Sequence, residues 1–206
     1  GDYHADKVKA EIYAFYDKRQ RDLYALDFDD LILWTVRMFA KFPEILEKWQ
    51  RHFSYILVDE FQDIDKKQYE LINQLTGPNN NLLVVGDPDQ TIYTWRGADV
   101  NIIMNFAKDY PQAKTIILNE NYRSVEAILN GANSVIKNNK YRVDKELFTN
   151  RHSDEKITHY SAASDEYQAA WIAGKISSLH REGKSYHDIA ILYRSNYLSR
   201  SLEKAL

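Results

Sequence analysis

Cysteine is absent from this chain of 206 residues, which excludes disulfide bonds, thiolate metal sites and cysteine nucleophiles. An excess of positive charge is absent as well, because 27 Lys and Arg stand against 30 Asp and Glu and the formal net charge is −3. No global basic field therefore attracts a nucleic acid, and any binding of that kind must rest on local groups.

Long hydrophobic runs are also missing. No run approaches the roughly 20 apolar residues that span a bilayer, and the polar start of the chain at residues 1–4 lacks a signal-peptide core. We therefore expect no membrane span and a cytoplasmic location. Hydrophobic residues still make up 44% of the chain, which is enough for a real core in one large or two small domains.

The stretch around which the chain is organised is SYILVDEFQD at 54–63. Its apolar run predicts a short buried strand that ends at Asp59 and Glu60, and ligands of open parallel sheets lie beyond the carboxyl ends of strands. There Asp59 suits a hard cation such as Mg²⁺, and Glu60 can deprotonate a water, as in the Walker B arrangement of nucleotide triphosphatases. The alternative is that Asp59 caps the next helix and Glu60 is simply solvated.

Helical and strand patterns alternate along the chain. Helices are predicted at 6–24, from an Asp27 N-cap to just before Pro43, from Pro43 to 49, at 65–75 before the turn residues 77–80, and at 99–108, 125–137 and 165–181. Strands are predicted at 55–58, 82–85, 115–118, 156–160 and 189–193. Because such strands need crossover connections, the predicted class is α/β with a parallel sheet and right-handed βαβ units. The polar stretch 138–154 is expected at the surface.

Polar and aromatic side chains gather in GDPDQTIYTWRGAD at 86–99, directly after a predicted strand. Gln90 can donate to a phosphate oxygen or hold a water. Tyr93 and Trp95 offer flat faces on which unpaired bases can stack, and Arg96 adds a cation beside them. The alternative places both rings in the core and makes Arg96 part of a structural ion pair.

A second polar stretch, NENYRS at 119–124, follows the predicted strand at 115–118. Arg123 in that place can reach a transferring phosphate as an arginine finger, and Tyr122 can cover a nucleotide base. The alternative is an ordinary helix start in which Ser124 is the cap.

Together these stretches resemble motifs II, III and IV of superfamily 1 helicases of the UvrD/Rep/PcrA type. DEFQD at 59–63 matches the DExQD box, residues 86–98 match the GDxDQxIYxWRGA block, and residues 121–124 match NYRS. The resemblance continues through 26–31 upstream and through 192–196 with Ser199 and Arg200 downstream, so it covers almost the whole chain. Phe61, where many members have Tyr, and Thr91, where many have Ser, are mild departures.

The resemblance implies a RecA-like parallel sheet with flanking helices, of the P-loop NTPase type. Residues 1–26 would be a helix from the end of an inserted helical subdomain. Residues 27–118 would be the C-terminal part of a first RecA-like domain, and residues 119–206 the N-terminal part of a second one. The implied activity is ATP-dependent DNA unwinding in repair or replication, with 3′ to 5′ polarity.

The resemblance also implies roles for individual residues in using ATP and Mg²⁺. Asp59 would help to hold the Mg²⁺ of MgATP, Glu60 would be the general base, and Gln90 would sense the γ-phosphate and couple it to DNA. Tyr122 would stack on adenine, and Arg123 would be an arginine finger from the second RecA-like domain.

The implied partners are single-stranded DNA and duplex junctions. Tyr93 and Trp95 would stack on single-stranded bases, and Arg96 would link that site to the nucleotide. Arg194 and Asn196 would contact the tracked strand.

The phosphate-binding pattern G-x-x-x-x-G-K-[ST] occurs nowhere in the sequence. We therefore expect a central piece of a longer helicase that does not hydrolyse ATP by itself and that self-associates through exposed sheet edges. Two other interpretations stay open. One is a helicase subunit of a recombination helicase-nuclease, which shares the DExQD box, and the other is a non-catalytic DNA-binding module.

Overall fold

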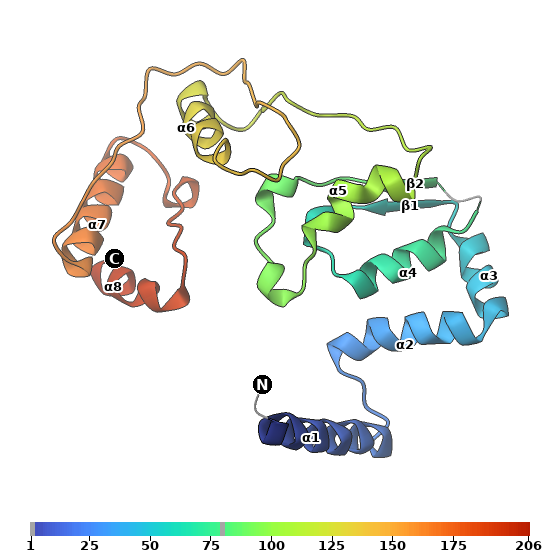
Figure 1. The fold of residues 1–206 in the computed structure, drawn as a ribbon. Coiled ribbons are helices and arrows are strands. Elements are labelled where there is room, and N and C mark those ends of the chain that lie inside the picture. The colour runs from blue at the N-terminus through green and yellow to red at the C-terminus, as the bar shows by residue number, and fades with distance from the viewer. Residues whose placement is uncertain (1–2, 79–80) are drawn as a thin grey trace. The chain divides into compact units, whose positions relative to one another are not determined.

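The structure of this chain, a computed structural model, describes residues 3–78 and 81–206 (Figure 1). Gly1, Asp2, Asn79 and Asn80 lie outside the described residues, and with them part of the predicted turn at 77–80. The chain divides into two units, one that runs to Arg151 and one that begins at His152.

Three helices open the first unit: α1 (Tyr3–Asp22), α2 (Phe28–Lys41) and α3 (Pro43–His52). The predicted cap of α2 is confirmed, since the Asp27 carboxylate accepts from the N–H of Asp30 at 2.9 Å and the Asp30 carboxylate accepts from the N–H of Asp27 at 3.3 Å. Pro43 occupies the first turn of α3, as predicted.

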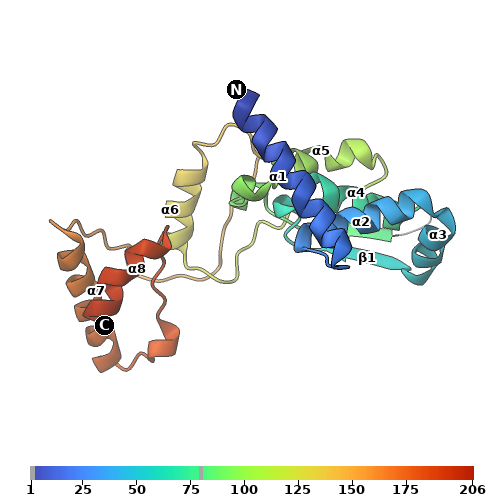
Figure 2. The same ribbon diagram turned by 90° about the horizontal axis from the view of Figure 1, so that it is seen from below.

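A two-stranded parallel sheet follows, made of β1 (Tyr55–Val58) and β2 (Asn81–Val84). Tyr55 pairs with Asn81 and Val58 with Val84. The connection is α4 (Lys66–Thr76), which Asp65 caps by accepting from the N–H groups of residues 67 and 68. The predicted strand–helix–strand unit is therefore confirmed. Helices α2, α3 and α4 lie side by side (Figures 1 and 2), joined by hydrogen bonds between Gln50 and Gln74 O (2.6 Å) and between Gln74 and Val36 O (3.3 Å).

The core lies on one face of this sheet, under α4 and α5 (Val100–Asp109) (Figure 1). Phe61 is fully buried, and its ring meets those of Tyr69 and Phe106 edge-on, with centroids 6.0 and 5.4 Å apart. The side chains that make up and surround this cluster are Val58, Phe61, Ile64, Tyr69, Ile72, Val84, Ile102, Ile103 and Phe106.

The prediction of fully buried strands is wrong for the other face. Tyr55 and Leu57 are each 70% exposed, and Leu83 and Val85 are 55% and 49% exposed. Alternate residues of a strand point to opposite faces, so these four share a face that no described element covers. Whether such surfaces cause self-association stays a prediction.

Three of the predicted strands, at 115–118, 156–160 and 189–193, are wrong. In residues 81–206 these segments run without a hydrogen-bonded neighbour, and the single bridge outside the sheet joins Glu120 to Phe148. A strand forms only where its backbone hydrogen-bonds to a neighbouring strand. Ile116 and Leu118, which are 70% and 77% exposed, lie in a segment without such a neighbour among the described residues.

The remaining predicted helices are confirmed as α5, α6 (Glu126–Ile136) and α7 (Asp165–Arg181). Ser124 does not cap α6, because Val125 holds that position and the Asn121 side chain accepts the N–H groups of Arg123 and Ser124 instead. In the second unit α7 lies beside a further helix, α8 (Ser199–Ala205) (Figures 1 and 2), and Ser201 Oγ donates to Asp165 Oδ2 at 2.8 Å.

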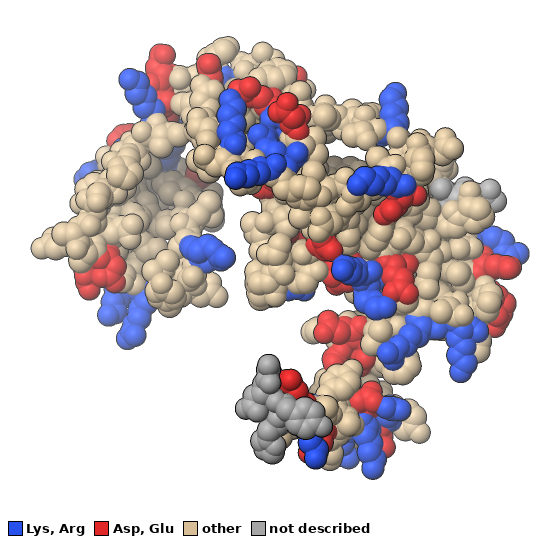
Figure 3. All heavy atoms as spheres, in the orientation of Figure 1, with Lys and Arg blue, Asp and Glu red and all other residues tan. Residues whose placement is uncertain are grey.

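Lys and Arg side chains lie among Asp and Glu side chains on the face of the molecule in Figure 3. Across residues 3–78 and 81–206 no helix is both long enough and apolar enough to traverse a bilayer.

We predict that Phe61→Ala lowers the free energy of unfolding of the first unit by about 3–5 kcal/mol, because it empties the centre of the core. Phe28→Ala is the matched control. Phe28 is 90% exposed, so its loss should change that free energy by no more than about 0.5 kcal/mol. Urea titrations followed by circular dichroism measure both, and equal costs for the two variants would contradict the assignment of the core.

Candidate functional site

The carboxyl ends of the two strands are joined beyond the sheet itself. The N–H of Val85 donates to Val58 O at 2.8 Å, and the N–H of Phe61 donates to Val85 O at 3.0 Å. The loops that begin at Asp59 and Gly86 therefore leave the sheet next to each other, as parallel pairing of β1 and β2 predicts.

Asp59 and Glu60 are both exposed at the end of β1. Asp59 Oδ1 accepts from the N–H of Glu60 at 2.8 Å and caps no helix, since Asp65 caps α4. Glu60 has φ 50° and ψ 40°, a left-handed conformation that costs a residue with a side chain of order 1–3 kcal/mol. Two carboxylates thus reach solvent at this edge, one of them on a strained backbone.

Gln62 connects this loop to the next one. The side chain is 1% exposed, and its Oε1 accepts from the N–H of Asp87 at 3.0 Å. Its Nε2 donates to Glu60 Oε2 at 2.8 Å and to Asp63 Oδ2 at 3.2 Å. The buried amide therefore fixes the Glu60 carboxylate relative to the backbone at Asp87. Gln62 belongs to the DExQD box, but no local sequence pattern indicates this contact, because its partner lies 25 residues away.

Gly86 is the position that admits this amide. A Cβ on Gly86 would lie 2.7 Å from Gln62 Oε1 and 3.0 Å from both Phe61 N and Ile103 Cδ1. Real Cβ atoms do not approach other heavy atoms as closely as 2.7 Å, so a side chain here would force Gln62 or its neighbours to shift. Glycine therefore fits between the two loops without displacing either.

Gln90 ends a short helical turn (Pro88–Gln90) that begins after Asp87. Its Nε2 donates to Asp87 Oδ2 at 2.7 Å, and the side chain is otherwise exposed. Burial by itself would raise the pKa of Asp87, but hydrogen bonds from Lys145 and Gln90 outweigh it and hold that pKa below its usual value. Asp87 is therefore a carboxylate at neutral pH, able to orient the Gln90 amide.

Two cations from the stretch 138–154 complete what we call the charge cluster, which consists of Asp87, Asp89, Arg142 and Lys145. Lys145 Nζ hydrogen-bonds to Asp87 Oδ1 and lies 3.5 Å from Asp89 Oδ2, and Arg142 Nη2 lies 3.2 Å from the same Asp89 oxygen. The side chains of Asp89, Lys145 and Arg142 are 7%, 12% and 13% exposed. The expectation that this stretch lies at the surface is wrong for both cations, because no local sequence pattern indicates partners more than 50 residues away.

The two rings of the next segment are on the surface, which excludes the core alternative. Trp95 is 68% exposed and Tyr93 40%. The Arg96 guanidinium carbon lies 4.7 Å from the Trp95 ring centroid and 5.8 Å from that of Tyr93. Within the described residues Arg96 forms no salt bridge, so it is held by the rings and open to an anion.

Tyr122 and Arg123 are exposed in the loop before α6. The Tyr122 hydroxyl donates to Glu120 Oε2 at 2.9 Å, and this hydrogen bond raises the pKa of Tyr122. Arg151 Nη1 donates to the carbonyl oxygens of Tyr122 and Arg123 at 3.1 and 2.8 Å. The backbone of the loop is thus fixed while both side chains extend from it.

Arg194 and Asn196 belong to the second unit. Both are exposed, Arg194 just before and Asn196 at the start of a short helical turn (Asn196–Leu198). The structure brings together the loops of Glu60 and Gln90 by direct contact, and it leaves these two residues on a unit of their own.

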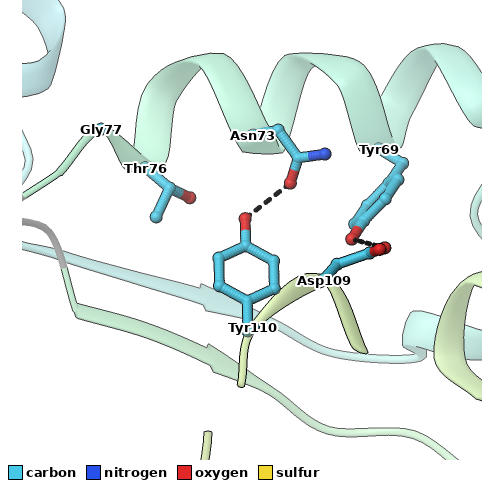
Figure 4. A pocket seen from close by; sticks show the side chains of 6 residues that line it. All are labelled: Tyr69, Asn73, Thr76, Gly77, Asp109 and Tyr110. Carbon is cyan, nitrogen blue, oxygen red and sulfur yellow. Dashed lines mark hydrogen bonds between the residues drawn. The ribbon is translucent and has the colours of Figure 1, made fainter. Parts of the chain in front are cut away.

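An open pocket of about 290 Å³ lies beside α4, lined by Tyr69, Asn73, Thr76, Gly77, Asp109 and Tyr110 (Figure 4). Its polar groups already satisfy one another, since the Tyr69 hydroxyl donates to Asp109 Oδ2 at 2.7 Å and the Tyr110 hydroxyl donates to Asn73 Oδ1 at 2.6 Å. Burial and the bond to Asp109 raise the pKa of Tyr69. The pocket is built for stability, and the chemistry-bearing loops do not line it.

Metal ligands are sparse in the described part of the chain, where no group of three or more His, Asp or Glu side chains converges on one point. One exposed carboxylate nevertheless fits Mg²⁺, which uses one or two protein carboxylates and takes its other ligands from phosphates and water. Asp59 meets that requirement, because only one of its two oxygens accepts a hydrogen bond from the described residues.

Comparison with known families gives a match over nearly the whole chain. Residues 2–111 match the UvrD/REP helicase N-terminal domain, and residues 116–206 match the UvrD-like helicase C-terminal domain. Both matches are to helicase domains, which is the class of protein to which the chain belongs. Since the first match alone covers more than half of the sequence, the chain belongs to the UvrD/REP helicase family.

Curated relatives agree with this assignment. The chain is similar to the ATP-dependent DNA helicase PcrA of Staphylococcus aureus, with 49% identity over 203 residues, and to that of Bacillus subtilis, with 48% identity over 202 residues. Each alignment covers 98% of this chain but only 28% and 27% of the relative. The chain thus spans little more than a quarter of the length of these relatives.

We predict that Gly86→Ala destabilises the first unit by about 1–3 kcal/mol, because the added methyl group forces Gln62 or the Phe61 backbone to move. Gly174→Ala serves as the control. Gly174 lies in α7, and a Cβ added there would meet nothing within 4 Å, so alanine should stabilise the helix by about 0.5–1 kcal/mol. Chemical denaturation measures both, and an unchanged stability of Gly86→Ala would refute the close fit.

Proposed function

We propose that this chain forms part of an ATP-dependent DNA helicase that couples MgATP hydrolysis to translocation on single-stranded DNA and unwinding of duplex junctions. The carrying observation is the contact through Gln62, which holds the exposed Glu60 carboxylate and the Gln90 loop at one edge of the sheet. The exposed rings of Tyr93 and Trp95 follow on that same loop segment. The names of the relatives support the proposal, since those proteins are called ATP-dependent DNA helicases.

The fold of the whole would be RecA-like. In this proposal β1, α4 and β2 belong to the larger parallel sheet of a P-loop NTPase. Residues 1–26 would belong to an inserted helical subdomain, 27–118 to the first RecA-like domain and 119–206 to the second. The sequence has no G-x-x-x-x-G-K-[ST] pattern, so the chain by itself would not hydrolyse ATP.

The chemistry proposed for the strand ends follows from the side chains there. Mg²⁺, when bound, would neutralise charge on the β- and γ-phosphates with Asp59 among its ligands. Glu60, oriented by Gln62, would accept the proton of the attacking water. The Gln90 side-chain amide, held by Asp87, would donate a hydrogen bond to the γ-phosphate.

The loop before α6 would supply the groups on the other side of the nucleotide. Tyr122 would stack on the adenine, and Arg123 would place its guanidinium against the charge that develops on the γ-phosphate. Exposure of both side chains supports this role.

The DNA contacts proposed are of the sequence-independent kind. Tyr93 and Trp95 would stack on bases, and Arg96 would add a cation beside them. Arg194 and Asn196 would contact the same strand. By family resemblance the motion would run 3′ to 5′, in DNA repair or replication. The helicase names of the relatives favour this function over a helicase-nuclease subunit or a non-catalytic module.

We predict that Glu60→Gln in a full-length helicase containing this chain lowers ATP turnover about 100- to 10,000-fold, because the amide cannot accept the proton. Nucleotide binding should persist. Glu70→Gln, which alters an exposed carboxylate paired with Lys67 at 2.6 Å, is the control and should leave turnover unchanged. Phosphate release in the presence of single-stranded DNA is the measurement. A Glu60→Gln rate close to that of the wild type would eliminate Glu60 as the base.

We predict that Trp95→Ala weakens single-strand binding by about 1–3 kcal/mol, roughly 5- to 150-fold in Kd, because one base loses its stacking partner. Trp34→Ala is a close control. Trp34 is also partly exposed and also carries an arginine over its ring, Arg37 at 4.9 Å, but it lies on α2. Anisotropy titrations of a labelled oligothymidine at fixed salt measure both. Equal affinities of the Trp95→Ala variant and the wild type would refute the stacking role.

A further inference from the structure

The charge cluster is connected to Gln90 through one carboxylate. Asp87 Oδ1 faces Lys145, and Asp87 Oδ2 accepts from Gln90 Nε2 at 2.7 Å. The Asp87 backbone is fixed as well, by the bond from its N–H to Gln62. Asp87 Oδ1 also accepts from the N–H of Asp89 at 3.0 Å, so the direction of the Gln90 amide depends on how this N–H and Lys145 together hold the Asp87 carboxylate.

Lys145 can set that position only if its own backbone is held, and the residues after it meet this condition. Asn133 of α6 donates to Leu147 O at 2.8 Å. The N–H of Phe148 donates to Asn119 O at 3.0 Å, and the N–H of Asn121 donates to Phe148 O at 2.7 Å. Lys145 thus begins a segment that is bonded to α6 and to the loop before it.

The same segment ends at the Arg123 loop, where Arg151 donates to the carbonyl oxygens of Tyr122 and Arg123. From Lys145 to Phe148 the chain is three residues long and spans at most about 11 Å. Such a short tether leaves Lys145 little freedom to move away from the cluster.

The four charges are also shielded from water, with side-chain exposures between 7% and 25%. Shielded charges interact more strongly than surface pairs, and removal of one partner leaves another charge uncompensated. Lys145 has two carboxylate partners, and Arg142 donates to the carbonyl oxygen of Lys145 at 2.9 Å. The cluster is therefore a fixed frame and not a chance surface contact.

We infer that Lys145, supported by Arg142, is a positioning residue that acts through Asp87 to aim the Gln90 amide at the nucleotide. The inference rests on the proposed function, because the orientation of the Gln90 amide matters only if that amide senses a phosphate. Neither Lys145 nor Arg142 touches the nucleotide in this scheme.

The test uses a full-length helicase that contains this chain. Lys145→Met keeps most of the side-chain stem and removes the ammonium group. Its kcat for DNA-stimulated ATP hydrolysis should fall about 10- to 100-fold, the loss expected when a catalytic group is misplaced by about 1 Å, while KM for ATP changes little. Lys145→Arg, which keeps the charge, should restore most of the rate.

Lys137→Met is the matched control. Lys137 pairs with Glu146 at 3.4 Å with both side chains exposed, so its loss alters the same region without reaching Asp87. Its kcat should equal that of the wild type. Melting temperatures report whether each variant folds, and Lys145→Gln replaces Lys145→Met if the methionine variant unfolds.

A double-mutant cycle separates positioning from general stabilisation. Because Lys145 acts through Gln90, the Lys145→Met/Gln90→Ala enzyme should be no slower than Gln90→Ala alone. Losses that multiply, or a folded Lys145→Met enzyme with normal kcat, would overturn the inference and leave the proposed function intact. A normal kcat for Gln90→Ala would instead overturn the role of Gln90, and the inference with it.

Discussion

One buried side-chain amide, that of Gln62, fixes the two loops at the strand ends relative to each other through its hydrogen bonds. A primary amide both donates and accepts, so Gln62 can hold the Glu60 carboxylate with its nitrogen and the Asp87 backbone with its oxygen. A carboxylate in its place would offer no donor, and an aliphatic side chain would leave a buried N–H unsatisfied. Gly86, which adds no Cβ, lets the amide lie between the loops. The relation of the two loops thus depends on the side-chain chemistry of a residue that is itself buried.

The acidic side chains at the strand ends fall into two groups, one paired and one exposed. Asp87 and Asp89 are compensated by Lys145 and Arg142 and are partly or largely buried, so they shape the loop. Asp59 and Glu60 have no cationic partner in the described part of the chain and remain in water. The rings behave similarly, since Phe61 fills the core while Trp95 stays outside. Residues of one type are therefore either packed and paired or left exposed, and the exposed ones are those to which the proposed function assigns chemistry.

Local signals predict local structure well in this chain. The cap at Asp27 and the helices predicted at 65–75 and 165–181 are confirmed because each needs only its own neighbours in sequence. The apolar run at 115–118 fails as a strand because a strand needs a partner that sequence periodicity cannot supply. The motifs predict that Asp59 and Gln90 lie on adjacent loops, and β1 pairs with β2 accordingly. Lys145 escapes prediction for the converse reason, since its two carboxylates come from a distant part of the chain.

At Glu60 the left-handed backbone favours one kind of residue, and the chemistry proposed for the side chain requires another. Glycine, or to a lesser degree asparagine, would adopt φ 50° with less strain than glutamate does. On backbone strain alone, thermal robustness would favour replacing the acid, whereas the hydrogen bond from Gln62 and the proposed chemistry both use its carboxylate. Engineering that ranks variants of this chain by melting temperature would therefore reward a change that destroys the chemistry proposed for it.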